Sequence, residues 1–117
     1  MFQDTIVALS TAQGISAIAV IRLSGNESFS IVEKCFRGHN LSEKPSHTIH
    51  FGTMWNKDQV IDEVLVSIFK KPNSFTKEDV IEISCHGSPV IIKEILKVLI
   101  QHGARLADIS RAAGCRP

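Results

Sequence analysis

The stretch NSFTKEDVIEISCHGSPVII, residues 73–92, decides the fold because it couples the alternation of a β-strand to the start of a helix. In its strand part, successive residues alternate between an apolar face and a largely polar face. The apolar face holds Ile81, Ile83 and Cys85, and the other face holds Val80, Glu82, Ser84 and His86. The apolar face predicts a core contact. The polar face is either solvated surface or the wall of a binding site.

A helix is predicted directly after this strand. Ser88 is expected as its N-cap, Pro89 takes the first helical position, and Gly103 follows its end. Between these signals, apolar residues recur at helical spacing, and Lys93 and Lys97 lie on the polar side. We therefore expect an amphipathic helix that packs its apolar side against the sheet.

The remaining segments complete an α+β fold. A first helix is expected over residues 24–37, where Ser24 or Asn26 is the N-cap and Glu27 completes a capping box with Ser24. Further strands are expected at 4–11, 17–25, 48–55, 60–69 and 104–108. The predicted architecture is a mixed, mostly antiparallel sheet with two main helices on one face.

Composition limits the class of protein. The 117 residues are 44% hydrophobic and 21% charged, which suits one soluble domain. The net charge of +1 is too small for a stand-alone nucleic-acid binder. Three cysteines without metal-like spacing, no signal-peptide pattern and no apolar run of ~20 residues predict a cytoplasmic protein that does not enter a membrane.

The predicted domain covers residues 1–107. The last ten residues, 108–117, have no periodicity and fit none of the expected elements. We expect them to be a frayed end, a cut domain or a non-native tail.

Arg22 is the sharpest local oddity in the sequence. It interrupts the strand at 17–25, which is apolar on both alternating faces and is therefore expected to be covered on two sides. A guanidinium in that position needs a carboxylate or another rich acceptor, because an unpaired buried charge is very costly. It either forms an internal ion pair, lies at a strand end that reaches solvent, or clamps an anionic ligand group.

Glu82 leaves the same choice between a structural and a binding role. It is either a solvated strand residue or an acceptor for two N–H donors of a planar heterocycle. Cys85 and His86 are neighbours on a strand and point to opposite faces, so a Cys–His nucleophile is disfavoured and Cys85 is expected in the core. The backbone amides of Gly87, Ser88 and Val90 are candidate anion donors.

Several other kinds of site have no support in the sequence. Neither GxxxxGK[ST] nor GxGxxG occurs, so no nucleotide-binding loop is expected. The histidines have no metal-ligand spacing, and no pair of carboxylates is placed for general acid–base chemistry. We therefore assign no metal ligand and no catalytic residue.

Two segments taken together resemble one known family. DTIVALSTAQGISAIAVIRLSG (4–25) and PNSFTKEDVIEISCHGSPVIIKEILKVLIQHGARLA (72–107) are similar to the amino-terminal domain of the tRNA modification GTPases called MnmE or TrmE. The resemblance implies a fold similar to half of the folate-binding unit of the glycine-cleavage aminomethyltransferase. It also implies a homodimer and a reduced folate as ligand, either 5-formyltetrahydrofolate or 5,10-methylenetetrahydrofolate.

The resemblance further implies what the complete protein does. In that family a separate GTPase domain uses GTP, Mg and K, and the protein acts with the flavin-dependent partner MnmG (GidA) on the wobble uridine of certain tRNAs. The present chain has no GTPase loop. We therefore expect it to show no enzymatic activity by itself.

Two site residues follow from the resemblance. The family's folate-contacting arginine falls on Arg22 of IRLSG, and its folate-contacting glutamate falls on Glu82 of EDVIE. Glu82 is then expected to accept hydrogen bonds from the N–H edge of the pterin. The same pocket is expected to include Gly14, Ser84, His86 and Gly87.

The sequence also departs from the family pattern. The family has prolines and several glycines where this chain has residues 12–17, although Gly14 is retained. After GARLA the family continues with a PGEF…RAFLN segment and a folate-contacting lysine, which DISRAAGCRP does not supply. The alternative function is therefore a dimerisation or interaction module with an incomplete folate pocket.

Overall fold

The strand of the decisive stretch, β6 (Val80–His86), lies in the middle of a seven-stranded sheet. The structure is a computed structural model that describes residues 4–11, 17–74 and 77–107. The strand order is β3-β4-β5-β6-β2-β1-β7, in which only β1 and β7 run parallel to each other. The predicted fold class, α+β with a mixed and mostly antiparallel sheet, is confirmed.

The other elements follow the predicted order with two short additions. The strands are β1 (Ile6–Leu9), β2 (Ile18–Ser24), β3 (Phe36–Arg37), β4 (Thr48–Asn56), β5 (Gln59–Phe69) and β7 (Arg105–Leu106). The helices are α1 (Ser28–Glu33), the short 3-10 helix η1 (Leu41–Glu43) and α2 (Pro89–Gln101). The additions, β3 and η1, fall where the sequence predicted a helix end and a loop.

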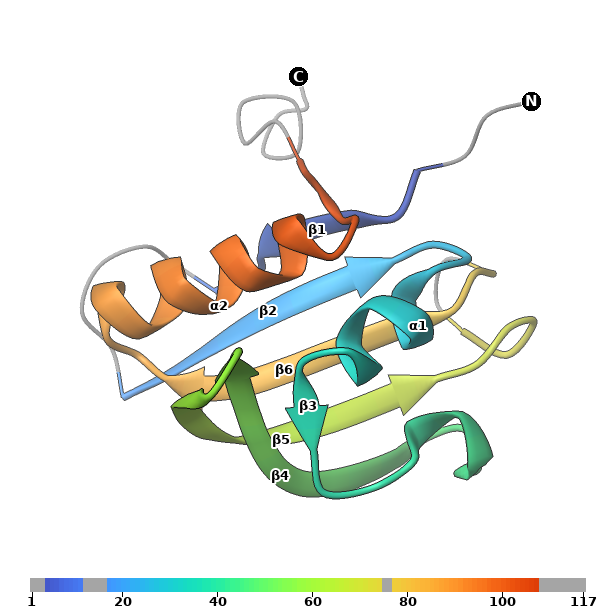
Figure 1. The fold of residues 1–117 in the computed structure, drawn as a ribbon. Helices are drawn as coiled ribbons and strands as arrows, with labels where there is room; N and C mark the ends of the chain where they lie inside the picture. The colour runs from blue at the N-terminus through green and yellow to red at the C-terminus, as the bar shows by residue number, and fades with distance from the viewer. Residues whose placement is uncertain (1–3, 12–16, 75–76, 108–117) are drawn as a thin grey trace.

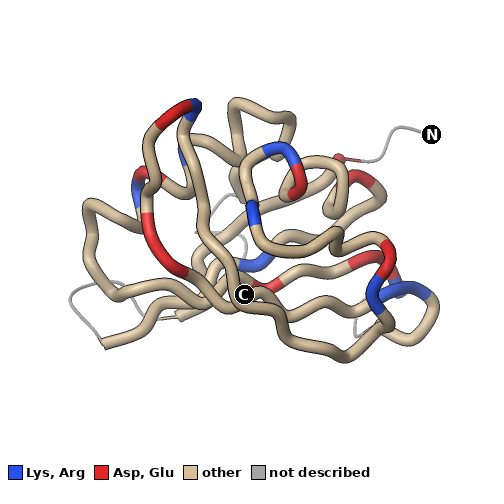
Figure 2. The backbone as a smooth tube through the Cα atoms, turned by 60° about the horizontal axis from the view of Figure 1, so that its bottom comes forward, with Lys and Arg blue, Asp and Glu red and all other residues tan. Residues whose placement is uncertain are grey.

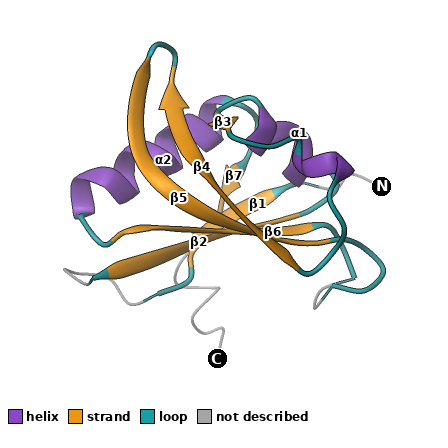
Figure 3. Cartoon of the chain, turned by 90° about the horizontal axis from the view of Figure 1, so that it is seen from below, coloured by secondary structure: helices purple, strands orange, loops and turns teal. Residues whose placement is uncertain are grey.

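Both main helices cover the same face of the sheet. Figure 1 shows α1 and α2 in front of the strands, and the view from below in Figure 3 places both helices on one side. Burying a large aliphatic side chain there stabilises the fold by about 1.5–3 kcal/mol. The fully buried side chains of this core include Ile21, Leu23, Ile81, Ile83, Ile95 and Leu99. The apolar face of β6 therefore packs as its alternation predicted.

The ends of α2 form as the sequence predicted. The Ser88 hydroxyl accepts a hydrogen bond from the Ile91 amide at 3.4 Å, and Pro89 is the first helical residue. At the other end, Gly103 has φ +121°, a backbone conformation that side chains rarely adopt. This glycine turns the chain from α2 into β7.

The predicted first helix is too long, and its predicted capping box is wrong. Ser24 is the last residue of β2, and its hydroxyl donates to Glu78 at 3.0 Å instead of capping a helix. The turn at Gly25 has φ +145°, and a Cβ there would lie 2.7 Å from Thr5. This close contact with the chain before β1 delays the helix until Ser28.

The expectation that β2 is covered on both faces is also wrong for the described residues. Ile18 is exposed, and Val20 and Arg22 are only partly buried. These residues alternate with the buried Ala19 and Ile21 and so belong to the face that no helix covers. We call this face, which carries Ile18, Val20 and Arg22 of β2 and Glu82, Ser84 and His86 of β6, the open face.

The described helices give no candidate for a membrane span, because none is both long and apolar enough to cross a bilayer.

Cys35 and Cys85 should react slowly with alkylating reagents while the protein is folded. Burial raises the pKa of the Cys35 thiol to about 12, and burial with a smaller effect of Asp62 raises the pKa of the Cys85 thiol to about 11. In a Cys115→Ser variant at mildly alkaline pH, we expect iodoacetamide to react about 100-fold or more slowly than in guanidinium chloride, because so little thiolate forms. Equal rates in both conditions would contradict the buried placement.

Candidate functional site

Arg22 and Glu82 form an ion pair on the open face. Nε of Arg22 donates to Oε2 of Glu82 at 3.0 Å, and Nη2 of Arg22 donates to the same oxygen at 2.5 Å. The two side chains come from residues sixty positions apart in the sequence. The structure thus brings together the two residues that the sequence singled out.

The antiparallel register of β2 and β6 places the Arg22 and Glu82 side chains next to each other. Arg22 is the direct partner of Glu82, and directly paired residues project from the same face of a sheet. On the other side of Glu82, the paired residue of β5 is Ser67. Three neighbouring strands therefore contribute polar side chains to one row of the open face.

The ion pair leaves hydrogen-bonding capacity unused. Both described bonds end on Oε2, so Oε1 of Glu82 and Nη1 of Arg22 have no partner among the described residues. The side chains are 40% and 26% exposed for Arg22 and Glu82 respectively, and a pair so open to water stabilises a fold by about 1 kcal/mol at most. One acceptor atom and one donor atom of the pair are therefore left without a hydrogen-bond partner among the described residues.

These atoms border a concave site. A cavity of about 410 Å³ is lined by Arg22, His47, Phe69, Asn73, Ser74, Val80 and Glu82. Its volume lies in the range of small-ligand pockets. The His47 and Phe69 rings pack edge to face at 5.2 Å between centroids and form an aromatic wall. The sequence analysis missed His47, because its proximity depends on the pairing of β4 with β5 rather than on any local pattern.

A second cavity lies further along β6. It has a volume of about 330 Å³, and Ser84 and His86 line it together with apolar residues of β2, β4 and β5. His86 contacts Asp62, a residue to which the sequence analysis gave no role. The alternation on β6, by which Glu82, Ser84 and His86 share a face, was the signal that predicted two of these lining residues.

The two glycines predicted for the pocket, Gly14 and Gly87, are not placed in either cavity by the described residues. Gly14 lies outside the described residues. The Gly87 amide donates to the Ala17 carbonyl at 3.2 Å, so the expectation that this amide is free for an anion is wrong. Gly87 extends the pairing of β6 with β2 by one further bond, and this use of the amide accounts for the difference.

A thiol nucleophile at Cys85 does not fit the structure. The Cys85 side chain is almost fully buried on the helix-covered face, while His86 is exposed on the open face. The predicted placement of Cys85 in the core is therefore confirmed.

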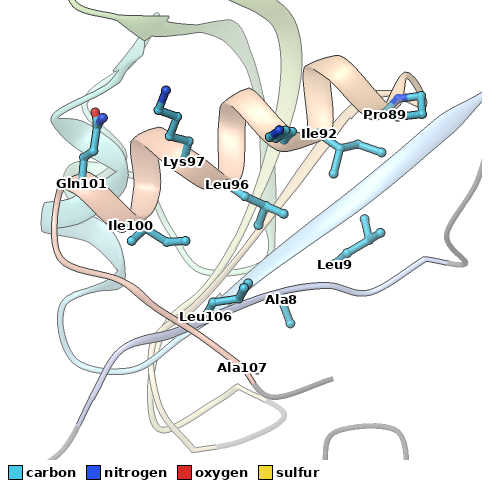
Figure 4. Close-up of a pocket in the computed structure, with 11 residues that line it drawn as sticks. Ala8, Leu9, Pro89, Ile92, Leu96, Lys97, Ile100, Gln101, Leu106 and Ala107 are labelled. Atoms are coloured by element: carbon cyan, nitrogen blue, oxygen red, sulfur yellow. The ribbon is translucent and has the colours of Figure 1, made fainter. Parts of the chain in front are cut away.

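A separate groove of about 610 Å³ lies between α2 and the strands β1 and β7. Figure 4 shows Leu96 and Ile100 of α2 facing Leu9 and Leu106 across this groove. Its walls are apolar, and Lys97 and its polar neighbours lie toward the rim. A small-molecule site needs a few convergent polar groups. The groove lacks such a set among the described residues, whereas the Arg22–Glu82 cavity has one.

Charge does not favour any large anionic partner. Figure 2 shows basic and acidic residues interspersed along the backbone, in keeping with 13 basic and 12 acidic residues overall. Within the described ranges, no three His, Cys, Asp or Glu side chains come together in a way that could hold a metal ion. The local donor and acceptor pair of the open face is therefore the electrostatic feature that stands out.

Comparison with known proteins gives a consistent result. Residues 5–109 match the family model described as "GTP-binding protein TrmE N-terminus". A tRNA modification GTPase MnmE from Cytophaga hutchinsonii is 54% identical over 104 residues, 89% of this chain. Proteins of the same name from Streptococcus mutans and Bacillus cereus are 46% and 47% identical, each over 90% of this chain.

The chain spans 23% of the length of each of these three relatives. The family model, however, covers most of the chain, from β1 through β7. The chain therefore belongs to the family of the TrmE N-terminal domain.

Proposed function

We propose that this chain is the reduced-folate-binding and homodimerisation domain of a GTPase that modifies tRNA. The observation that carries the folate part is the Arg22–Glu82 pair at a cavity of about 410 Å³, in which one carboxylate oxygen and one guanidinium nitrogen have no partner within the described part of the chain. The tRNA part rests on the relatives, which are named tRNA modification GTPases.

The donor set suits the heterocycle of a reduced folate. A pterin carries an amino group and a ring N–H on one edge, and a carboxylate oxygen accepts such donors in strong, charge-assisted hydrogen bonds. Glu82 would supply that acceptor through Oε1. Arg22 would hold the carboxylate in place through Oε2 and offer Nη1 to an electron-rich atom of the ligand. The reduced folate, 5-formyltetrahydrofolate or 5,10-methylenetetrahydrofolate, would bring the one-carbon unit.

The open face also supports self-association. Ile18, Ile49, Phe51 and Leu65 are exposed, and by strand register all four project from this face. Large apolar side chains grouped on one exposed surface are typical of protein interfaces. Two copies that meet through this surface would also shield the ligand from water.

The remaining functions of the complete protein lie outside this chain. GTP, Mg and K would bind a GTPase domain, and MnmG and tRNA would be contacted by the full assembly. Without those parts, the chain would act as a binding and assembly domain and would catalyse no reaction.

Folate binding should depend on both members of the ion pair. Calorimetric titration with 5-formyltetrahydrofolate should show binding to the wild-type chain, and Glu82→Gln and Arg22→Ala should each weaken it about 10- to 100-fold. This loss corresponds to one charge-assisted hydrogen bond. Because the pair contributes little to stability, both variants should retain the wild-type circular dichroism spectrum.

Glu43→Gln is the matched control for the titration. Glu43 is an exposed carboxylate of η1, which does not line the cavity, so its neutralisation should leave affinity unchanged. No detectable binding by the folded wild-type chain would reject the folate function and favour a dimerisation module with an incomplete pocket.

Dimerisation should depend on the apolar part of the open face. Sedimentation equilibrium should give a dimer for the wild-type chain and a monomer for Phe51→Glu, because a charge would replace an apolar side chain that is 57% exposed in the single chain. Val90→Glu introduces the same charge at an exposed position of α2 and should remain dimeric. A wild-type chain that stays monomeric at high concentration contradicts the proposal.

A further inference from the structure

The backbone pairing of β5 with β6 stops before β6 ends. Their pairing runs from Phe69 opposite Val80 to Leu65 opposite Ser84, two residues short of His86. Beyond that point a side chain replaces the backbone partner, because the His86 amide donates to Oδ2 of Asp62 at 2.8 Å. The cavity of about 330 Å³ lies at this separation of the strands.

The same carboxylate orients the imidazole of His86. Nδ1 of His86 lies 2.8 Å from Oδ1 of Asp62. A carboxylate only accepts hydrogen bonds, so Nδ1 carries the proton, and in the neutral ring Nε2 is an acceptor. The Asp62 side chain is only 9% exposed, whereas that of His86 is 68% exposed. Nε2 has no partner among the described residues, so the structure holds a fixed acceptor at the edge of a cavity.

The two polar side chains, Glu82 and His86, lie along the same strand. Glu82 and His86 project from the same face of β6 and are four residues apart, a separation of about 13 Å. Between them lies Ser84, which is flanked by Val20 of β2 and Leu65 of β5. The open face therefore offers a polar end, an apolar middle and a second polar end.

We propose that His86, oriented by Asp62, is a second recognition point for the ligand that binds at Glu82. Nε2 of His86 accepts a hydrogen bond from an N–H donor in the distal part of the ligand. This inference rests on the proposed function, and for a reduced folate the distal part is the p-aminobenzoylglutamate tail with its amide N–H. The aromatic ring of the tail lies over the apolar middle.

A donor suits this end of the site better than an anion does. Asp62 and Glu63 both place carboxylates near the imidazole, Asp62 through direct contact and Glu63 as a lining residue of the same cavity. A ligand carboxylate at Nε2 would be repelled by both, whereas an amide N–H would be favoured. The two carboxylates of the glutamate tail must then point away from Asp62 and Glu63, into solvent.

The test compares two ligands on the same variants. His86→Ala should weaken binding of 5-formyltetrahydrofolate about 3- to 10-fold, the value of one neutral hydrogen bond. It should leave binding of 6-methyltetrahydropterin, which has no tail, within about twofold of the wild type. Glu82→Gln should weaken both ligands, because both contain the pterin edge.

Asp62→Asn tests whether Asp62 orients the imidazole of His86, and it leaves that imidazole in place. The asparagine amide would donate to Nδ1 and move the imidazole proton to Nε2, which then can no longer accept. This variant should therefore match His86→Ala in its selective loss of 5-formyltetrahydrofolate, although the imidazole stays in place.

The outcomes distinguish a failure of the His86 role from a failure of the proposed folate binding. If the wild type binds the folate, Glu82→Gln weakens it, and both His86→Ala and Asp62→Asn leave its affinity unchanged, the role of His86 is rejected while the proposed function stands. An equal loss of both ligands in these variants also rejects a role in tail recognition. If the folded wild type binds no folate, both the proposed function and this inference fail.

Discussion

The antiparallel pairing of β2 with β6 is the constraint on which the site depends. It fixes Arg22 opposite Glu82, Val20 opposite Ser84 and Ile18 opposite His86. A shift of one residue in this register would turn every one of these side chains to the other face. The buried faces of both strands prevent that shift, because Ile21 and Ile83 must remain under the helices. The hydrophobic core thus determines where the polar groups of the open face meet.

The helices cover only one side of the sheet, and this asymmetry separates stability from function. The covered side contains the aliphatic core, and the open side contains an ion pair worth little to folding together with exposed apolar residues. Side chains that add little stability and stay accessible are free to serve binding. The same surface holds a polar row at Glu82, an apolar row at Ser84 and an oriented imidazole at His86. Ligand binding and self-association are therefore proposed for one surface.

The sequence predicted those parts of the fold that depend on local patterns. The alternation on β6, the capped helix α2 and the hairpin of β4 and β5 all followed from periodicity and from Ser88, Pro89 and Gly103. The late start of α1 was not predicted, because it depends on the contact of Gly25 with Thr5 across the fold. Residue types and the resemblance singled out Arg22 and Glu82, but only the register reveals that they touch. Asp62 and His47 had no local signal, because each acquires its neighbours from strand pairing and loop closure.

The central claim is that the open face at Arg22 and Glu82 receives the ligand. The most direct measurement is an amide NMR titration of the isotopically labelled chain with 5-formyltetrahydrofolate. The account predicts that the largest shift changes fall on β2 and β6, at the amides around Arg22, Glu82 and Ser84. Shift changes concentrated instead on Leu96 and Ile100 of α2, beside the apolar groove, would contradict it.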